Sequence, residues 1–577
     1  MKTLLISAVI VLAVWSGATS PDAQASPFES GAALSPQTKI DECVLARLKK
    51  LGLEPASVCT DAVFVRRAFL DIIGTLPTAK EAREFLEDKD PKKRSALIDR
   101  LMERPEFSDY WAMKWSDLLR IKAEFPINLW PNAAQAYHRW VLDCLRENMP
   151  YDKFVREMLT SNGSNFRVGQ VNFYRAVQSK DQETIAKAVA LTFMGERAEK
   201  WPKEKLAGMA QFFSKIGYKQ TGEWKEEIVF FDPAKTATVA TNAIEQAATP
   251  ADAAEKKKKS ESAKPAKLAA TFPDGTPAKI AEGRDPRVVF ADWLISPKNP
   301  WFARNIVNRI WSWFLERGII HEPDDIRPDN PPVNPELLAY LEKELVACKY
   351  DLKHLFRVIL NSQTYQLSSV PKTKSAEAEA NFASYPLRRL EAEVLIDALN
   401  QITGTTERYS SPVPEPFTFI PEDQRSIALP DASITSSFLE MFGRPSRDTG
   451  LEGERSSKPT ADQRLHMLNS SHIQRKIENS PKLQALFSSA NASVKPPKPP
   501  KFRKGVRYTP PPAPAGPTVE QRREEIVNQL YLTVLSRFPT EPEMKAVAEY
   551  MQAGSKREAA IDLTWALVNS AEFLYRH

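Results

Sequence analysis

The first residues of chemical interest lie in a short acidic loop, residues 321–332. Its carboxylates Asp324, Asp325 and Asp329 surround Arg327. Such a group can bind a cation, or two of the carboxylates can act as a general acid and base. The favoured alternative is structural: the carboxylates cap helices and pair with Arg327. The loop is therefore a candidate site, but it defines no reaction by itself.

A second group of charged residues lies between positions 444 and 455. Neighbouring arginines and carboxylates can line a groove or bind an anion, and glutamates can serve as acid and base in the hydrolysis of a polysaccharide. The favoured alternative is a salt-bridge network that ties the C-terminal region to the core. The group consists of Arg444, Arg447, Asp448, Glu452, Glu454 and Arg455.

The histidines do not form a metal-binding motif. His466 and His472 are six residues apart and are not expected to share a helix face. His138, His321 and His354 are isolated in the sequence. There is also no Ser-His-Asp arrangement, and the 20 glycines include no phosphate-binding loop. We therefore expect no metal site.

The N-terminus has the features of a secretory signal peptide. Lys2 precedes an apolar run over residues 4–15, and Ala23-Gln24-Ala25 is a cleavage site of the A-x-A type. Cleavage is predicted after Ala25, which places the mature protein outside the cytoplasm, in the periplasm or secreted. No later segment approaches the roughly 20 apolar residues of a membrane span, so we expect no transmembrane anchor in the mature chain.

All four cysteines lie beyond the predicted cleavage site and would enter an oxidising compartment. Cys43 and Cys59 flank a short helix and turn, so a local disulfide between them is one expectation and two free thiols the other. Cys144 and Cys348 lie on apolar helix faces, where buried thiols are expected.

Four helices are predicted within residues 285–369, and their starts are marked by caps. Asp285-Pro286, Asn299-Pro300 and Asn334-Pro335 each combine a capping residue with proline in the first turn, and Asp351 caps the fourth helix. Apolar residues follow at helical spacing after each cap. This stretch lies in a C-terminal helical module, residues 284–577.

An N-terminal helical module is predicted over residues 41–222, so the whole chain is expected to be mainly α. Helical patterns continue to a last helix over residues 203–216. Trp111 and Trp115 lie one helical turn apart and are expected in the core, because such a pair packs more often than it forms a stacking platform.

A small linker, residues 223–283, joins the two modules. Short strands are expected at 227–231, 236–240 and 267–272. A disordered insert is expected at 242–265, and an extended, basic, proline-rich loop at 495–517 within the C-terminal module.

Several stretches resemble a family with two modules. VRRAFLDIIGTLPT, WSDLLR and ENMPYDKFVREMLTSNGSNFRVGQVNFYRA resemble domain of unknown function fifteen forty-nine. NPWFARNIVNRIW, ERGIIHEPDDIRPDNPPVNPELL and YDLKHLFRVILNSQTYQLSS resemble domain of unknown function fifteen fifty-three. In this order, the two modules resemble the planctomycete-type cytochrome-associated proteins.

The sequence departs from this family at two places that carry sulfur. Family members commonly have a C-x-x-C-H segment, which resembles a c-type haem attachment site, after F-x-G-x-R. Here only Ala198-Glu199-Lys200 stands between Arg197 and Trp201, and no C-x-x-C occurs elsewhere. A later C-E-C-E-R stretch has Leu451 and Gly453 in place of its cysteines. The resemblance therefore implies a member without covalent haem, and we expect no cofactor.

The composition argues against one class of partner but does not identify the function. A net charge of +6 over 577 residues is a mild excess, so a nucleic-acid partner is not expected. The leading hypothesis is a binding or assembly component of an envelope complex, whose partner carries haem or is an envelope enzyme. The alternatives are a hydrolase of polysaccharides or their sulfated derivatives, using Asp324, Asp325, Glu452 or Glu454, and a redox protein with noncovalent haem or another metal.

Overall fold

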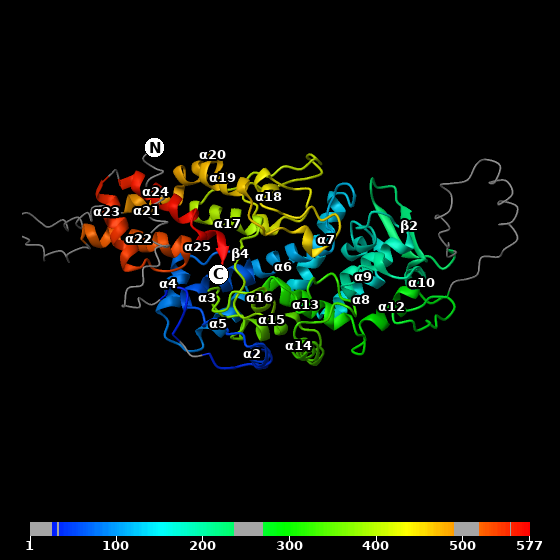
Figure 1. Ribbon diagram of the computed structural model, residues 1–577. Coiled ribbons are helices and arrows are strands. Elements are labelled where there is room, and N and C mark those ends of the chain that lie inside the picture. Colours follow the sequence, from blue (N-terminus) through cyan, green and yellow to red (C-terminus); the bar gives the residue numbers. More distant parts are fainter. Residues whose placement is uncertain (1–25, 32–33, 236–268, 490–517, 554–555) are drawn as a thin grey trace, which may run out of the picture.

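The computed structural model describes residues 26–31, 34–235, 269–489, 518–553 and 556–577 (Figure 1). The fold is mainly α-helical, and in the described ranges strands form only two small sheets, which confirms the predicted class. None of the helices described is long and apolar enough to cross a membrane. The predicted signal peptide, the strand at 236–240, the insert at 242–265 and the loop at 495–517 lie outside the described residues.

The first part of the chain is a series of helices with well-formed caps. Thr38 and Thr78 each form a capping box, with Asp41 and Glu81 respectively, and the Thr78 box follows the sequence prediction. The helices are α2 (Lys39–Leu51), α3 (Asp61–Ile73), α4 (Ala79–Glu87), α5 (Lys93–Met102), α6 (Pro105–Leu118), α7 (Pro131–Arg146), α8 (Tyr151–Thr160), α9 (Gln182–Met194) and α10 (Lys203–Ala210).

A three-stranded antiparallel sheet follows, in the order β1-β3-β2. It consists of β1 (Gly163–Ser164), β2 (Ile216–Gln220) and β3 (Glu227–Phe231), so the strand predicted at 227–231 is confirmed. The helix predicted to reach residue 216 is wrong. It ends at Ala210 and gives way to a short 3-10 turn, η3 (Gln211–Phe213), because the next residues pair with β3 from Ile216 to Gln220.

The strand predicted at 267–272 is not formed in its described part. Thr271 makes only an isolated bridge to Pro277, because the chain turns back on itself where the Gly275 N–H donates to the Phe272 carbonyl.

The second part of the chain contains the four predicted helices and a longer C-terminal series. Asp285, Asn334 and Asp351 cap their helices as predicted, each accepting a backbone N–H. The four helices are α12 (Pro286–Leu294), α13 (Phe302–Leu315), α14 (Pro335–Ala347) and α15 (Leu352–Leu360). The later helices are α16 (Ala376–Ala380), α17 (Ala392–Thr403), α18 (Ser437–Met441), α19 (Ala461–Asn469), α20 (Ser471–Glu478), α21 (Pro481–Ser489), α22 (Val519–Leu535), α23 (Glu541–Ala553), α24 (Lys556–Val568) and α25 (Ala571–Leu574).

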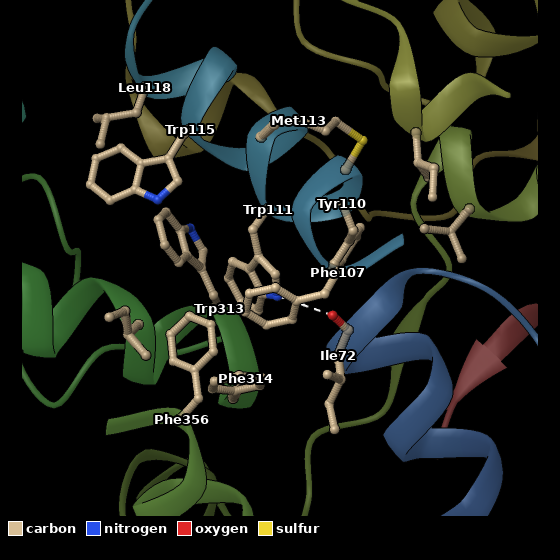
Figure 2. Close-up of a cluster of buried hydrophobic side chains, with 14 of the residues drawn as sticks. Ile72, Phe107, Tyr110, Trp111, Met113, Trp115, Leu118, Trp313, Phe314 and Phe356 are labelled. Atoms are coloured by element: carbon tan, nitrogen blue, oxygen red, sulfur yellow. Dashed lines mark hydrogen bonds between the residues drawn. The ribbon is translucent and has the colours of Figure 1, made fainter. Parts of the chain in front are cut away.

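One aromatic core joins the two parts (Figure 2). The Trp111 ring on α6 lies 5.5 Å from Trp313 of α13 and 4.5 Å from Phe356 of α15, measured between centroids. Trp115 lies 5.9 Å from Trp313. The Trp111 indole donates to the Ile72 carbonyl, so its polar atom is satisfied. Trp111 and Trp115 are buried, as predicted, and the two modules pack as one body around them.

A charged cluster is also buried between the modules, and Asp71 of α3 is at its centre. Both carboxylate oxygens of Asp71 are used: Arg388 and Arg576 donate to one at 3.0 and 2.7 Å, and the hydroxyls of Tyr365 and Tyr385 donate to the other at 2.9 and 2.8 Å. The arginines come from the strand pair β4 (Arg388–Arg389) and β5 (Tyr575–Arg576), so this pair fixes the C-terminal strand against α3.

Candidate functional site

A cavity of about 660 Å³ lies between the end of α9, the start of α10, the start of α13 and the acidic loop 321–332. We call it the Trp201–Trp301 cavity. Two isoleucines and several prolines give it apolar walls, and charged side chains occupy much of the rest. It is lined by Glu196, Arg197, Lys200, Trp201, Lys205, Pro300, Trp301, Arg304, Ile320, Asp325, Ile326, Arg327, Pro328, Asp329, Asn330, Pro331 and Pro332.

A buried carboxylate fixes both tryptophans of this cavity. Glu196 accepts a hydrogen bond from the Trp201 indole at 2.6 Å and another from the Trp301 indole. The Lys205 ammonium lies 3.9 Å from the Trp201 ring centroid and 3.8 Å from the Glu196 carboxylate. Because the tryptophans share one acceptor, their ring positions are set before any ligand arrives.

Gly195 allows the acidic loop to approach the end of α9. Its φ is +68°, and the Ile326 N–H donates to its carbonyl at 2.9 Å. A Cβ atom here would lie 2.7 Å from the Asn305 side chain and 2.9 Å from the Pro323 carbonyl. Asn305 in turn donates to the Thr192 carbonyl, so α9, α13 and the loop meet at this point.

Replacing Gly195 with alanine is expected to lower the free energy of unfolding by about 1–3 kcal/mol, because the side chain would combine a left-handed backbone with a steric clash. Urea denaturation at pH 7 measures the change. Gly222→Ala is the matched control, since no atom lies within 4 Å of its added Cβ, and it should change stability by no more than about 0.5 kcal/mol. Equal effects of the two substitutions would contradict this account.

The cations around the cavity are already paired with carboxylates. The charges therefore nearly balance, and the cavity presents fixed hydrogen-bond donors and acceptors without a strong net field. The pairs are Arg197–Glu322 at 2.9 Å, Lys200–Asp325 at 3.5 Å, Arg327–Asp325 at 3.0 Å, Arg327–Asp329 at 2.7 Å and Arg304–Glu342 at 2.7 Å.

The acidic loop is divided between the cavity and the core. Asp325, Arg327 and Asp329 line the cavity together. Asp324 instead points inward and is 1% exposed. It accepts from Arg309 at 2.7 Å, and its other oxygen accepts the Glu452 backbone N–H at 2.6 Å. Asp324 therefore links the loop to the 444–455 segment and has no free oxygen for proton transfer to a substrate.

Glu452 lies beside a much smaller space. Its carboxylate accepts from the Trp313 indole at 3.1 Å and from Arg309 at 3.3 Å. Burial raises the pKa of Glu452, while Arg309 and Lys114 oppose the shift. The Glu452 side chain is 33% exposed, but the adjoining cavity measures about 10 Å³, no more than a single water needs, so it offers no pocket for a sugar ring.

The other charged residues of the 444–455 segment hold the segment in place. Glu454 accepts from the Ser446 hydroxyl and from the Asp448 backbone N–H, and Asp448 pairs with Lys122 at 2.7 Å. The remaining contacts are Arg447–Asp117 at 2.8 Å, Arg455–Asp117 and Arg455–Glu393 at 2.7 Å, and Arg444–Glu393 at 3.4 Å. These pairs form a salt-bridge network between α6, α17 and the C-terminal region.

Glu393 of α17 is strongly held in its charged form. Burial alone would raise its pKa, but Arg455 and Arg444 outweigh burial and lower the pKa to about 2. The segment therefore holds the two modules together through buried salt bridges. Its arginines are already paired with carboxylates, which leaves no space for an anionic ligand.

His466 and His472 lie closer than their spacing predicts. Ser470 ends α19 and caps α20 by accepting the Ile473 N–H, so the two histidines are on different helices. His466 Nε2 lies 3.4 Å from His472 Nδ1, and His472 Nε2 lies 2.9 Å from Glu407. The two histidines share no helix face, as expected, but the interruption at Ser470 brings their rings together. Within the described ranges, no group of three or more His, Cys, Asp and Glu side chains is placed to hold a metal ion.

Of the two expectations for Cys43 and Cys59, the structure has two free thiols, both buried, and not the disulfide. Cys43 faces α14, where the Asn334 side chain donates to its carbonyl. Cys59 is held elsewhere, with its backbone N–H donating to the Gln366 carbonyl and its carbonyl accepting from Arg94. The two residues therefore contact different elements.

The cavity walls do not fit covalent haem. A 3-10 turn, η2 (Ala198–Lys200), joins Arg197 directly to Trp201 at the place where the resemblance implies a C-x-x-C-H segment. None of the lining residues is a cysteine, histidine or methionine, so thioether bonds and the usual axial ligands are missing.

Sequence reasoning missed the residues that make the cavity distinctive: Glu196, Trp201, Lys205 and Trp301. The available signal was two tryptophans next to prolines, Trp201-Pro202 and Pro300-Trp301, near a glutamate in a mainly apolar segment. The pairing itself was not visible, because Glu196 and Trp301 are 105 residues apart.

The fold and the cavity define a mainly helical protein in which two modules meet at one preorganised pocket. Residues 39–211 match the family model PSCyt2, described as Protein of unknown function (DUF1549), and residues 286–551 match PSD1, Protein of unknown function (DUF1553). The chain therefore belongs to the family in which these two modules follow each other, as the resemblance predicted. Neither the curated proteins nor the solved structures gave a match.

The cavity lies across both matched regions. Glu196, Trp201 and Lys205 come from the first, and Trp301 and the acidic loop come from the second. The pocket thus exists only when the two modules are packed together.

Proposed function

We propose that this chain is an extracytoplasmic binding protein and that the Trp201–Trp301 cavity takes a short, uncharged segment of a saccharide. The observation that carries the proposal is the pair of indoles fixed by the buried Glu196 at the junction of the two modules. The predicted signal peptide supports the location outside the cytoplasm.

The chemistry of the cavity suits a sugar. A pyranose ring has apolar C–H faces that can stack on an indole, and hydroxyl groups at its edge that donate and accept hydrogen bonds. The ion pairs of Lys200, Asp325 and Arg327 offer both kinds of partner in fixed positions. Since the charges nearly balance, they favour neutral over strongly anionic ligands, and a volume of about 660 Å³ lies in the usual range for small-molecule sites.

Binding is favoured over hydrolysis by the state of the carboxylates. Asp324, Glu452 and Glu454 are each engaged by neighbouring donors, and only Asp325 and Asp329 of the acidic groups reach the cavity from the loop. Both of these pair with Arg327. A general acid and a general base need free access to the scissile bond. We therefore propose that the protein binds a polysaccharide as a ligand and does not hydrolyse it.

We further propose that the protein works within an envelope complex and that the haem of this complex belongs to a partner. The absence of C-x-x-C from this chain and its resemblance to cytochrome-associated proteins support the idea. Purification from the native envelope with absorbance monitoring tests it. A Soret band that co-purifies with the chain and separates from it on dissociation is expected, whereas a band that stays with the isolated chain contradicts it.

Replacing Trp201 with alanine is expected to weaken saccharide binding by about tenfold, because truncation of this partly buried aromatic side chain removes the stacking surface. Isothermal titration with β-1,4-linked hexasaccharides of glucose, xylose and mannose measures the affinity.

Leu465→Ala is the control for this test, since Leu465 is 56% exposed and does not line the cavity. It should bind these short ligands like the wild type. If the wild type binds none of the three, or if Trp201→Ala binds as tightly as the wild type, the proposed ligand class is wrong.

A further inference from the structure

A second group of aromatic side chains lies on the surface, away from the cavity lining. Among the exposed large hydrophobic side chains of the described ranges, the aromatic ones are Phe125, Trp224, Phe417 and Phe419. They lie on only three segments: residues 122–130, 221–226 and 415–423. Exposed aromatic residues that are gathered in this way commonly mark a contact surface.

Trp130, Trp224 and Phe417 bring these three segments together, and we call them the aromatic platform. The ring centroids are 4.7 Å apart for Trp130 and Trp224, 5.3 Å for Trp130 and Phe417, and 5.7 Å for Trp224 and Phe417. The rings cross at 58–72°: Trp130 meets Trp224 and Phe417 edge to face, and Trp224 and Phe417 are tilted to each other. Trp224 is 61% exposed and Phe417 is 42% exposed.

The backbone holds the platform rigidly. Trp130 donates its N–H to the Ala123 carbonyl at 3.0 Å. In the same loop, the Ala123 N–H donates to the Asp431 carboxylate. Trp224 lies in the turn of the β2–β3 hairpin, which is closed by the pairing of Gln220 with Glu227. Phe417 donates its N–H to the Pro414 carbonyl at 3.1 Å. A surface that is ordered in advance loses little entropy when it binds.

The charges near the platform restrict its partner. The three segments contain six carboxylates and two lysines, so they are acidic in sum; Arg167 offsets part of this by pairing with Glu223 and Glu226. An acidic border repels anionic lipid headgroups and sulfated or carboxylated polymers. The Lys225 ammonium lies 5.6 Å from both the Trp130 and the Trp224 ring centroids and can donate to a hydroxyl group.

We infer that the aromatic platform is a second binding surface, which stacks on the sugar rings of an uncharged polysaccharide. Aromatic faces, one hydrogen-bond donor and an acidic border together fit a neutral polymer better than a membrane. The inference does not depend on the cavity, since different residues carry it. If the proposed function also holds, the chain contacts a polysaccharide at two places, and the platform favours long polymers over short ligands.

The test is sedimentation of the full chain with insoluble cellulose, chitin and β-1,3-glucan, each in 0.05 and 0.5 M NaCl. At least one polymer is expected to retain the wild type at both salt concentrations, since stacking is not screened. Trp224→Ala and Phe417→Ala should each weaken retention by about fivefold or more, because each removes one exposed ring. Leu465→Ala, a 56% exposed position on α19, should bind like the wild type.

Two further arms separate this inference from its rivals. Trp201→Ala should lower hexasaccharide affinity more than polymer retention, and Trp224→Ala should do the reverse, so loss of cavity binding and loss of platform binding are distinguishable. Vesicles of phosphatidylcholine and phosphatidylglycerol should not retain the wild type. The inference is overturned if no polymer retains the wild type, if Trp224→Ala and Phe417→Ala are retained as well as the wild type, or if vesicle binding depends on Trp224.

Discussion

Replacing Asp71 with alanine is expected to lower the free energy of unfolding by about 3–5 kcal/mol. The substitution would leave Arg388 and Arg576 buried with one acceptor fewer each, and the hydroxyls of Tyr365 and Tyr385 without their acceptor. A buried charge that loses its partner costs far more than the pair itself contributes. Urea denaturation at pH 7, followed by circular dichroism, measures the loss.

Asp143→Ala is the control for this prediction. Asp143 pairs with Arg146 at 3.2 Å on the surface of α7, where both side chains are at least half exposed. Its removal should cost no more than about 1 kcal/mol. If Asp71→Ala unfolds as late in urea as Asp143→Ala does, the cluster does not tie α3 to the C-terminal strand as described.

The second large effect is a loss of stability in mild acid, and it is centred on His138 of α7. Burial, with Arg447 and Arg139 nearby, lowers the pKa of His138 from 6.5 to about 3. Its Nε2 atom has no hydrogen-bond partner, so the folded protein keeps the ring neutral. Below pH 6.5 this histidine is protonated in the unfolded chain but stays neutral in the folded chain. The free energy of unfolding therefore decreases as the pH is lowered from 6.5 to about 3.

His138→Phe removes this titrating group, so the free energy of unfolding should depend less on pH. Between pH 7 and pH 4.5 the wild type should lose about 3 kcal/mol more than the variant, since each pH unit below the unfolded pKa costs about 1.4 kcal/mol. Urea denaturation at the two pH values gives the difference, and His138→Gln should behave like His138→Phe. A stability difference between wild type and variants that stays constant with pH would show that His138 does not carry the effect.

Local signals in the sequence predicted most of the helices. The helix starts at Asp285, Asn334 and Asp351 were visible because a cap depends on residues within one turn. The helix expected through residue 216 was wrong because strand pairing with residues 227–231 outweighs local helical spacing. The spacing of His466 and His472 does not reveal the interruption at Ser470, although serine is a common capping residue.

The candidate site was predicted only in part. Asp325, Arg327 and Asp329 were recognised because they cluster in one loop, and the structure places all three at the cavity. Glu196 and Trp301 could not be paired from the sequence, because their contact depends on how the modules pack. The sequence also could not show that Asp324 is buried while Asp325 lines the cavity, since these adjacent loop residues point in opposite directions.

The position of Arg576 has a consequence for the order of events in folding. Its guanidinium donates hydrogen bonds to both Asp71 and Glu391 inside the molecule, and its strand, β5, pairs with β4. A chain that is made from the N-terminus presents α3 long before β5, so Asp71 lacks the Arg576 donor until β5 has been made. The contact between α3 and β5 is therefore expected to form late, after both modules have been synthesised.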